Sequence, residues 1–125
     1  MSINNIVISE AELEIMKVLW NSKEPVTSLD IGEAVEAHGW KKTTIATFLA
    51  RLTEKGAISA EKNGKLYYYS PLVDAKEYRK SKTKSLINNL YHGSLKEFAV
   101  ALFQDNNLSE KDIAELRAIF EDKED

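Results

Sequence analysis

Apolar side chains near the start of the chain recur at the spacing of a helix. Four of them share one face, which is expected to be buried: Leu13, Met16, Leu19 and Trp20. Ser9 followed by Glu12 is a capping-box pair, so the helix is expected to begin directly after Ser9. The segment 21–25 interrupts the pattern and ends this first helix.

A second capping-box pair, Thr27 with Asp30, predicts another short helix over residues 28–38. Gly39 predicts its end, because glycine adopts the left-handed conformation of a helix C-terminus without strain. The side chains expected to face inward from this helix are Leu29, Ile31, Ala34 and Val35.

The stretch 40–56 predicts a third helix with one apolar and one polar face. Its apolar face carries Ile45, Phe48, Leu49 and Leu52. Its other face carries small hydroxyl groups among cations, namely Lys41, Lys42, Thr43, Thr44, Thr47 and Arg51. Gly56 is expected to supply the left-handed stop. Trp20 and Trp40 are interpreted as core anchors rather than ligand contacts.

A hairpin signal follows at residues 58–69, with Asn63-Gly64 as a type I′ turn between two strand-like runs. Successive strand residues point to opposite faces, so Tyr68 should point away from Tyr67 and Tyr69. The second and third helices are joined by a turn of only a few residues at Gly39, which is the helix-turn-helix unit. Three helices followed by a hairpin, over roughly residues 6–72, are typical of a winged helix-turn-helix. We therefore predict a mainly α fold with a winged-helix DNA-binding domain in residues 1–73.

The remaining residues, 74–125, predict helices only: one over 76–90, one from Ser94 to about Gln104, and one that Ser109 and Asp112 begin. About fifty residues in short helices cannot bury enough surface to offset the ordering entropy. We therefore expect a helical dimerisation domain, although the helices could instead fold back on the same chain. The residues expected to form the dimer contact are Leu86, Leu90, Leu95, Phe98, Leu102, Phe103, Ile113, Leu116 and Phe120.

Charge is distributed unevenly along the chain. The net charge is −3, yet residues 40–85 hold eleven lysines and arginines against four carboxylates, and the rest is acidic. A basic face on an acidic body favours a polyanion that approaches from one side. The absence of cysteine excludes disulfides and thiolate chemistry, and no apolar run is long enough to span a membrane. A cytoplasmic protein without membrane insertion is expected.

Two kinds of DNA contact follow from the side chains of the third helix and the hairpin. Thr43, Thr44 and Thr47 are candidates for base contacts, because short hydroxyls with methyl groups reach base edges. The candidates for phosphate or groove contacts are Lys41, Lys42, Arg51, Lys62, Asn63 and Lys65. Two alternatives remain open: Thr44 could cap the helix, and Arg51 could pair with Glu54.

Catalysis finds no support in the sequence. His38 and His92 are isolated, no nucleophile–base spacing is present, and no glycine-rich phosphate loop occurs. We expect no enzyme activity, no metal site and no cofactor.

The chain resembles the penicillinase and methicillin-resistance repressors, whose relatives include copper-responsive repressors. The residues that carry the resemblance are Ile8 to Glu12, Met16, Leu19-Trp20, Trp40 to Gly56, Tyr69 to Pro71, Gly93-Ser94, Leu108-Ser109, Asp112-Ile113 and Glu115-Leu116. The resemblance implies a homodimeric winged-helix repressor that occupies a dyad operator and blocks transcription of its own operon. It also implies that antibiotic resistance is the setting in which such repressors act.

In the antibiotic-resistance members, induction follows a cut in the C-terminal segment, triggered by a membrane sensor protease. Their cut site is an Asn-Phe pair, and the pair at this place here is Leu102-Phe103. The cysteine cluster of the copper-responsive relatives is missing, and Thr43 stands where the family often has lysine. The alternative function is a winged-helix protein-interaction module that does not bind specific DNA.

Overall fold

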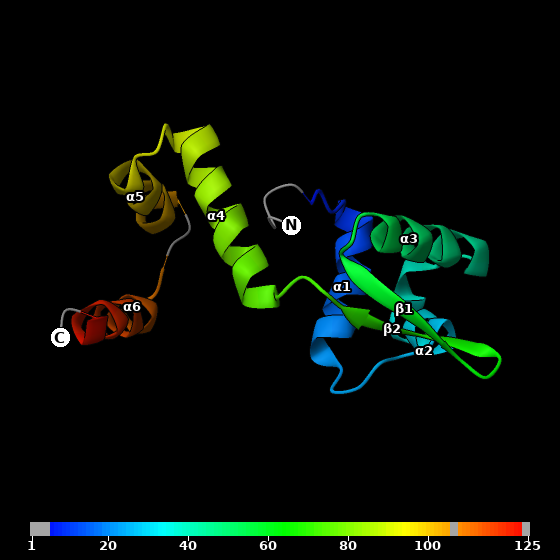
Figure 1. Ribbon diagram of the computed structural model, residues 1–125. Coiled ribbons are helices and arrows are strands. Elements are labelled where there is room, and N and C mark those ends of the chain that lie inside the picture. Colours follow the sequence, from blue (N-terminus) through cyan, green and yellow to red (C-terminus); the bar gives the residue numbers. More distant parts are fainter. Residues whose placement is uncertain (1–5, 106–107, 124–125) are drawn as a thin grey trace. The chain divides into compact units, whose positions relative to one another are not determined.

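The computed structural model describes residues 6–105 and 108–123, with side chains for residues 6–104 and 108–119, and it confirms a mainly helical winged-helix fold (Figure 1). Contacts divide the chain into two compact units, Met1–Ser81 and Lys82–Asp125. The first unit contains α1 (Glu10–Asn21), α2 (Ser28–Ala34), η2 (Glu36–His38), α3 (Lys42–Glu54), β1 (Ile58–Asn63) and β2 (Leu66–Pro71). Helix α4 (Ala75–Tyr91) begins in the first unit and ends in the second, which also contains α5 (Leu95–Asp105) and α6 (Glu110–Lys123).

The helix starts follow the capping signals of the sequence. Ser9 caps α1 and Thr27 caps α2, and in each case the acid three residues later closes a capping box. The expected helix over 28–38 is wrong in its second half, because α2 ends at Ala34 and a 3₁₀ turn carries the chain to Gly39. Val35, at this break, is buried in the core.

The prediction for the inward face of α2 is half right. Ile31 and Val35 are buried, but Leu29 is 64% exposed and Ala34 is exposed as well. Within α2 itself, Ile31 is the residue that is buried in the core. Leu29 and Ala34 therefore face away from the core that α2 contacts.

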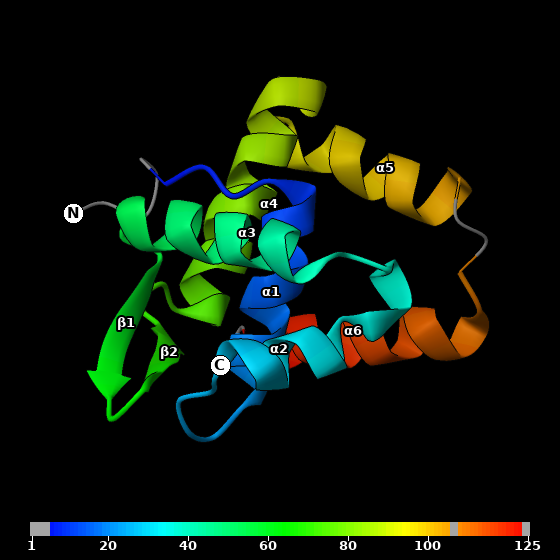
Figure 2. The same ribbon diagram turned by 90° about the vertical axis from the view of Figure 1, so that its right-hand side faces the viewer.

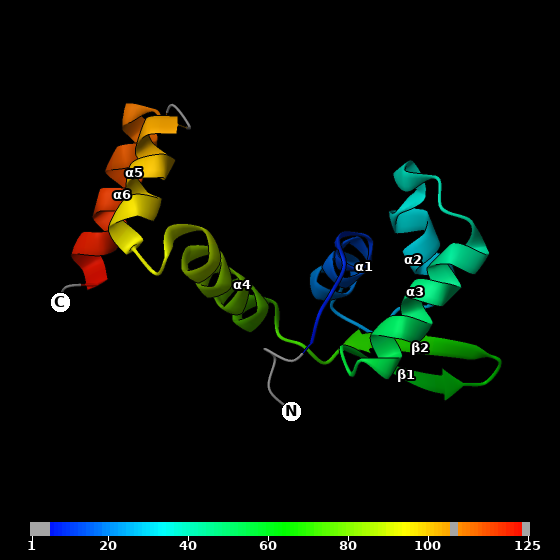
Figure 3. The ribbon, with the colours of Figure 1, turned by 90° about the horizontal axis from the view of Figure 1, so that it is seen from above.

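The core of the first unit lies where α1, α2, α3 and the hairpin meet. As expected, Met16, Leu19 and Leu52 are almost fully buried, and Ile15, which the predicted stripe did not include, is buried too. The expected core residues that lie half-buried against this cluster are Leu13, Trp20, Trp40 and Phe48. Figure 3 shows α3 between α2 and the hairpin, with α1 beside it.

The hairpin turn differs from its prediction. Asn63 pairs with Leu66, so the two-residue loop is Gly64-Lys65 rather than Asn63-Gly64. Only Gly64 has a positive φ, at 69°, as in a type II′ turn, whereas a type I′ turn needs two such residues. Register explains the difference: Ile58 opposite Pro71 and Ala60 opposite Tyr69 share the inner face, and this pairing sets where the loop falls.

A short bridge attaches the hairpin to the helices. The backbones of Val26 and Tyr69 exchange two hydrogen bonds of 3.1 and 2.8 Å. Just past the C-terminus of α3, Gly56 adopts the expected left-handed conformation, and the Ala57 N–H donates to the Leu52 carbonyl. The end of α3 and the base of the hairpin are thus fixed by backbone bonds.

The second unit confirms the predicted helix starts. Ser94 accepts from the Glu97 N–H at 3.1 Å, and Ser109 and Asp112 form a reciprocal pair. Helix α5 extends to Asp105, one residue beyond the expected end, and residues 106–107, where the sequence also predicts a break between the last two helices, lie outside the described residues. None of the described side chains from Lys82 onward is buried, in contrast to the first unit.

Candidate nucleic-acid interface

Helix α3 presents its polar face to solvent. Lys42, Thr43, Thr47 and Arg51 are exposed, and Thr44 is half-buried. Ile45, Leu49 and Leu52, on the other side of the helix, are buried in the core. The division into an apolar and a polar face therefore matches the one expected from the sequence.

The N-terminus of α3 is a site of unsatisfied backbone donors. Lys41 is the N-cap residue and makes no side-chain capping bond, and Thr44 lies three residues inside the helix. The alternative that Thr44 caps the helix is therefore wrong. The first N–H groups of an uncapped helix attract anions, and Lys41 and Lys42 add positive charge at the same end. This end is suited to hold a phosphate.

Thr47 is more constrained than its exposure suggests. Its hydroxyl donates to the Thr43 carbonyl at 3.0 Å, so the only hydroxyl hydrogen is committed to the helix backbone. The side chain can still accept a hydrogen bond and offer its methyl group. Both contacts suit a base edge, and the methyl suits the methyl of thymine.

Arg51 makes no ion pair among the described residues. The alternative that Arg51 pairs with Glu54 is therefore wrong. Lys55, just past the end of α3, does form an ion pair: its ammonium group contacts Glu12 at 2.5 Å. Arg51 is thus free to meet an external anion, whereas Lys55 serves the fold.

The pair between Glu12 and Lys55 joins the start of α1 to the end of α3. Glu12 is only 1% exposed, and it also accepts the Ser9 N–H at 2.9 Å. Burial raises the pKa of Glu12, but the hydrogen bonds from Lys55 and Ser9 and the Lys55 charge outweigh it, so the pKa lies below the usual value. The sequence marked Glu12 only as a capping residue, because no local signal shows a partner 43 positions away.

The wing brings the remaining candidates to the tip of the hairpin. Lys62, Asn63 and Lys65 are all exposed, and Lys65 lies in the turn itself. The register places Lys62 on the same face as Tyr67 and Tyr69, whereas Asn63 and Tyr68 belong to the other face, as expected for Tyr68. The three polar candidates therefore surround the tip rather than line one side.

Trp40 anchors the turn that leads into α3. Its ring stacks on His38 at 4.4 Å and meets Phe48 edge-on at 5.1 Å. His38 also lies 3.4 Å from Glu14 of α1. These contacts support the interpretation of Trp40 as an anchor, because they fix the approach of the chain to the uncapped helix start.

Known proteins that resemble this chain are repressors and regulatory proteins, in agreement with a winged-helix DNA interface. The penicillinase repressor family model matches residues 8–122. The penicillinase repressor of Bacillus licheniformis is 36% identical over 115 residues, which are 92% of this chain and 90% of that protein. The methicillin resistance regulatory protein MecI of Mammaliicoccus sciuri is 32% identical over 116 residues, 93% of this chain and 94% of that protein.

Solved structures match a little over half of the chain. The DNA-binding domain of the repressor BlaI superposes with a TM-score of 0.53 at 36% identity, covering 59% of this chain and 90% of that domain. The monomeric form of Bacillus licheniformis BlaI in complex with the blaP half-operator gives 0.50 at 37% identity, covering 58% and 88%. These proteins are DNA-binding repressors rather than enzymes. With its winged-helix unit and a match over nearly its whole length, this chain belongs to the penicillinase repressor family.

Proposed function

We propose that this winged-helix repressor acts as a homodimer that occupies a dyad operator and blocks transcription from it. The observation that carries the proposal is the polar face of α3, where exposed threonines lie beside Arg51 and Lys42, cations without a partner among the described residues. Such a face suits the major groove, with Thr43 and Thr47 toward base edges and the cations toward phosphates. Operator binding by BlaI supports the same reading.

The wing and the start of α3 supply the remaining proposed contacts. Lys62, Asn63 and Lys65 surround the hairpin tip, where they can reach the sugar-phosphate backbone or the minor groove. The uncapped start of α3, with Lys41 and Lys42, is the proposed seat for another phosphate. Together these groups position the protein, and the threonines read the sequence.

Dimerisation is proposed from the apolar surface of the second unit. Leu86, Leu90, Leu95 and Phe103 are between 40% and 68% exposed, although each is large and apolar. Four other proposed contact residues are half-buried: Phe98, Leu102, Ile113 and Leu116. The side chain of Phe120 lies outside the described part. Several large apolar groups exposed on two consecutive helices favour an interaction surface, and a second copy would cover both surfaces at once.

A dimer also matches the chemistry of the target. A two-fold protein places two reading helices on two half-sites one or more helical turns of DNA apart. Binding the second half-site is then effectively intramolecular, which raises affinity without any new kind of contact. No helix in the described ranges is long and apolar enough to cross a membrane. We propose that the dimer acts in the cytoplasm, where the DNA is.

Two substitutions in α3 should distinguish a phosphate contact, which positions the protein, from a base contact, which reads the DNA sequence. Lys42→Ala should weaken binding to all sequences alike and reduce the salt dependence, because one phosphate contact is lost. Thr47→Ala should instead reduce the preference for the operator over scrambled DNA by about 1 kcal/mol, the low end of the range for a bidentate base contact, because Thr47 offers only an acceptor and a methyl group. Fluorescence anisotropy on DNA from upstream of its own gene, at several salt concentrations, measures both.

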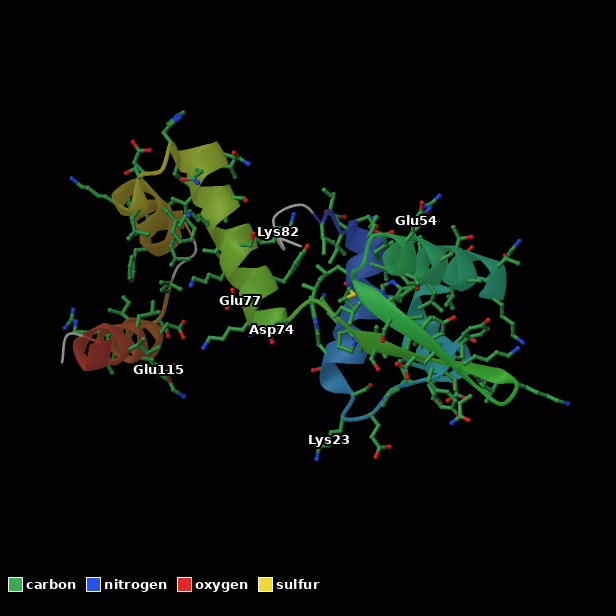
Figure 4. All side chains as sticks on the ribbon, in the orientation of Figure 1. Lys23, Glu54, Asp74, Glu77, Lys82 and Glu115 are labelled. Atoms are coloured by element: carbon green, nitrogen blue, oxygen red, sulfur yellow. The ribbon has the colours of Figure 1, made fainter. Side chains whose placement is uncertain are left out.

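Lys23→Ala is the matched control, since Lys23 is an exposed lysine in the loop between α1 and α2 (Figure 4). It should leave affinity and preference unchanged. If Lys42→Ala changed sequence preference as Thr47→Ala does, the assignment of the two contact types would be wrong. A monomer with no DNA affinity would instead favour the protein-interaction module.

Cleavage is the proposed means of induction, and Leu102-Phe103 is the proposed site. Both residues lie in the last turns of α5, and Phe103 is 40% exposed. A cut there would detach α6 and so remove part of the proposed dimer surface. A chain that ends at Leu102 should therefore be monomeric in sedimentation. Its affinity for the full operator should be about the same as the affinity of one monomer for a half-operator. A truncated chain that stayed dimeric would show that a cut there cannot release the operator.

A further inference from the structure

A hollow lies beside the proposed DNA interface, within the first unit. It has a volume of about 780 Å³ and is bordered by α2, α3 and the inner face of the hairpin. Figure 2 shows α3, α2 and the hairpin, the elements that supply the residues lining the hollow. A volume of this order matches the pockets that hold small molecules, roughly 300–1,000 Å³.

The walls of the hollow are mostly apolar. Leu29 from α2 and Tyr67 from β2 line it, and they are 64% and 50% exposed. Ala46 and Ala50, one turn apart on α3, form the opposite wall and are too small to fill the space. Gly32 of α2 adds no side chain at all. Small side chains on α2 and α3 thus leave space beside larger apolar ones.

The charged groups at the hollow are two carboxylates and one cation. Glu33 of α2 and Glu54 of α3 both line it, and neither makes an ion pair among the described residues. Figure 4 labels Glu54 at the end of α3 that leads into the hairpin. Lys42 is the one lining cation. Burial, then the neighbouring Tyr67, raises the pKa of Tyr69, so this lining phenol stays uncharged near neutrality.

This composition does not suit a DNA backbone. Phosphates are strongly hydrated anions, and an apolar wall with two unpaired carboxylates would strip their water without replacing it. An uncharged or cationic molecule with a large apolar surface gains from the same wall. Carboxylates and tyrosine faces both attract an ammonium group.

We propose that this hollow binds a small apolar molecule that carries a cationic amine, and that its binding opposes DNA binding. The second half of the inference rests on the proposed operator function. Lys42 connects the two sites, because it lines the hollow and also belongs to the proposed phosphate contacts. A ligand seated between α3 and the wing occupies space along the flank of the reading helix. Ligand and operator then lower each other's affinity by the same factor.

Three probes of one shape test the site without DNA. They are 1-naphthylmethylamine, 1-naphthylmethanol and 1-naphthoic acid, which differ mainly in charge. Binding to the full chain is followed by ligand-observed NMR. The amine should bind most tightly and the acid most weakly, by about fivefold or more between them, since two exposed carboxylates act together. No saturable binding by any probe would overturn the proposal.

Two variants locate the probe. Gly32→Phe should fill the hollow and weaken all three probes at least about tenfold; a Cβ at Gly32 meets only Ile45 at 3.7 Å, an ordinary contact. The double variant Glu33→Gln, Glu54→Gln should abolish the preference for the amine. Glu36→Gln is the control, because Glu36 is an exposed carboxylate just past α2 that does not line the hollow. Unchanged probe binding by Gly32→Phe in a folded protein would refute the site.

Competition is measured separately with operator DNA. The amine should lower the operator affinity of the wild-type protein, and it should have no such effect on Gly32→Phe. If the amine binds but the operator affinity is unchanged, the antagonism is wrong while the ligand site stands. If the protein binds no DNA at all, the proposed function fails, and the probe titrations still decide the ligand site.

Discussion

Replacing Leu90 and Leu95 together by aspartate should convert the proposed dimer into monomers and weaken operator affinity by about 10²–10⁴-fold. These two side chains are 64% and 68% exposed, so in the free chain a charge at either position disturbs little. In a dimer contact the same charges would be buried without partners, which is costly. Sedimentation velocity measures the association, and anisotropy on full and half operators measures the affinity.

The matched control for this experiment is Leu72→Asp. Leu72 is 62% exposed and lies in the first unit, outside the proposed dimer surface. It should leave association unchanged. The double variant should still bind a half-operator as the wild type does, because the core of the first unit does not depend on the second. If it remained a dimer with full operator affinity, the proposed dimer surface would be wrong.

Glu12→Ala should lower the free energy of unfolding by about 2–4 kcal/mol. Removing one member of a buried ion pair costs about 3–5 kcal/mol, and the loss of a capping-box partner adds to it. We take the lower range because the Lys55 side chain is 33% exposed and can turn to water when its partner is gone. Urea unfolding followed by circular dichroism measures the change, with Glu10→Gln as the exposed control on the same helix.

The same carboxylate gives the stability a pH dependence of known sign. The pKa of Glu12 is lower in the folded chain than the usual value of 4.5, so the unfolded chain binds the proton more readily. The stabilisation is therefore complete above pH 4.5 and is lost as the pH falls through the lower, folded pKa. Glu12→Gln should flatten the stability curve in this acid range. A wild-type curve that matched the Glu12→Gln curve there would mean that the ion pair contributes nothing.

Local chemistry made several features of this fold predictable. Ser9, Thr27, Ser94 and Ser109 each mark a helix start in the structure, because a cap satisfies backbone donors within three residues of itself. Helical spacing also sorted α3 correctly into a buried face and an exposed polar face. The capping signal depends only on neighbours in the chain, so the rest of the fold has little power to override it.

Features that depend on distant partners were not predictable in this way. Leu29 matched the expected apolar pattern of α2, but the core contacts only one face of that helix and leaves Leu29 at the edge of the hollow. Asn63-Gly64 is a strong turn signal, yet the pairing of Ile58 with Pro71 placed the loop one residue later. In both cases, contacts with other elements decided between local options of similar energy.

The sequence alone therefore determined the order of elements, the two-faced helix α3 and the family, because these follow from patterns within short stretches and their order. Tertiary structure decided which charges remain available: it pairs Lys55 with Glu12 across 43 positions and leaves Arg51 without an ion pair in the described part of the chain. It also formed the hollow, whose walls come from α2, α3 and the hairpin. Such features arise from where folded segments meet, and no single segment encodes them.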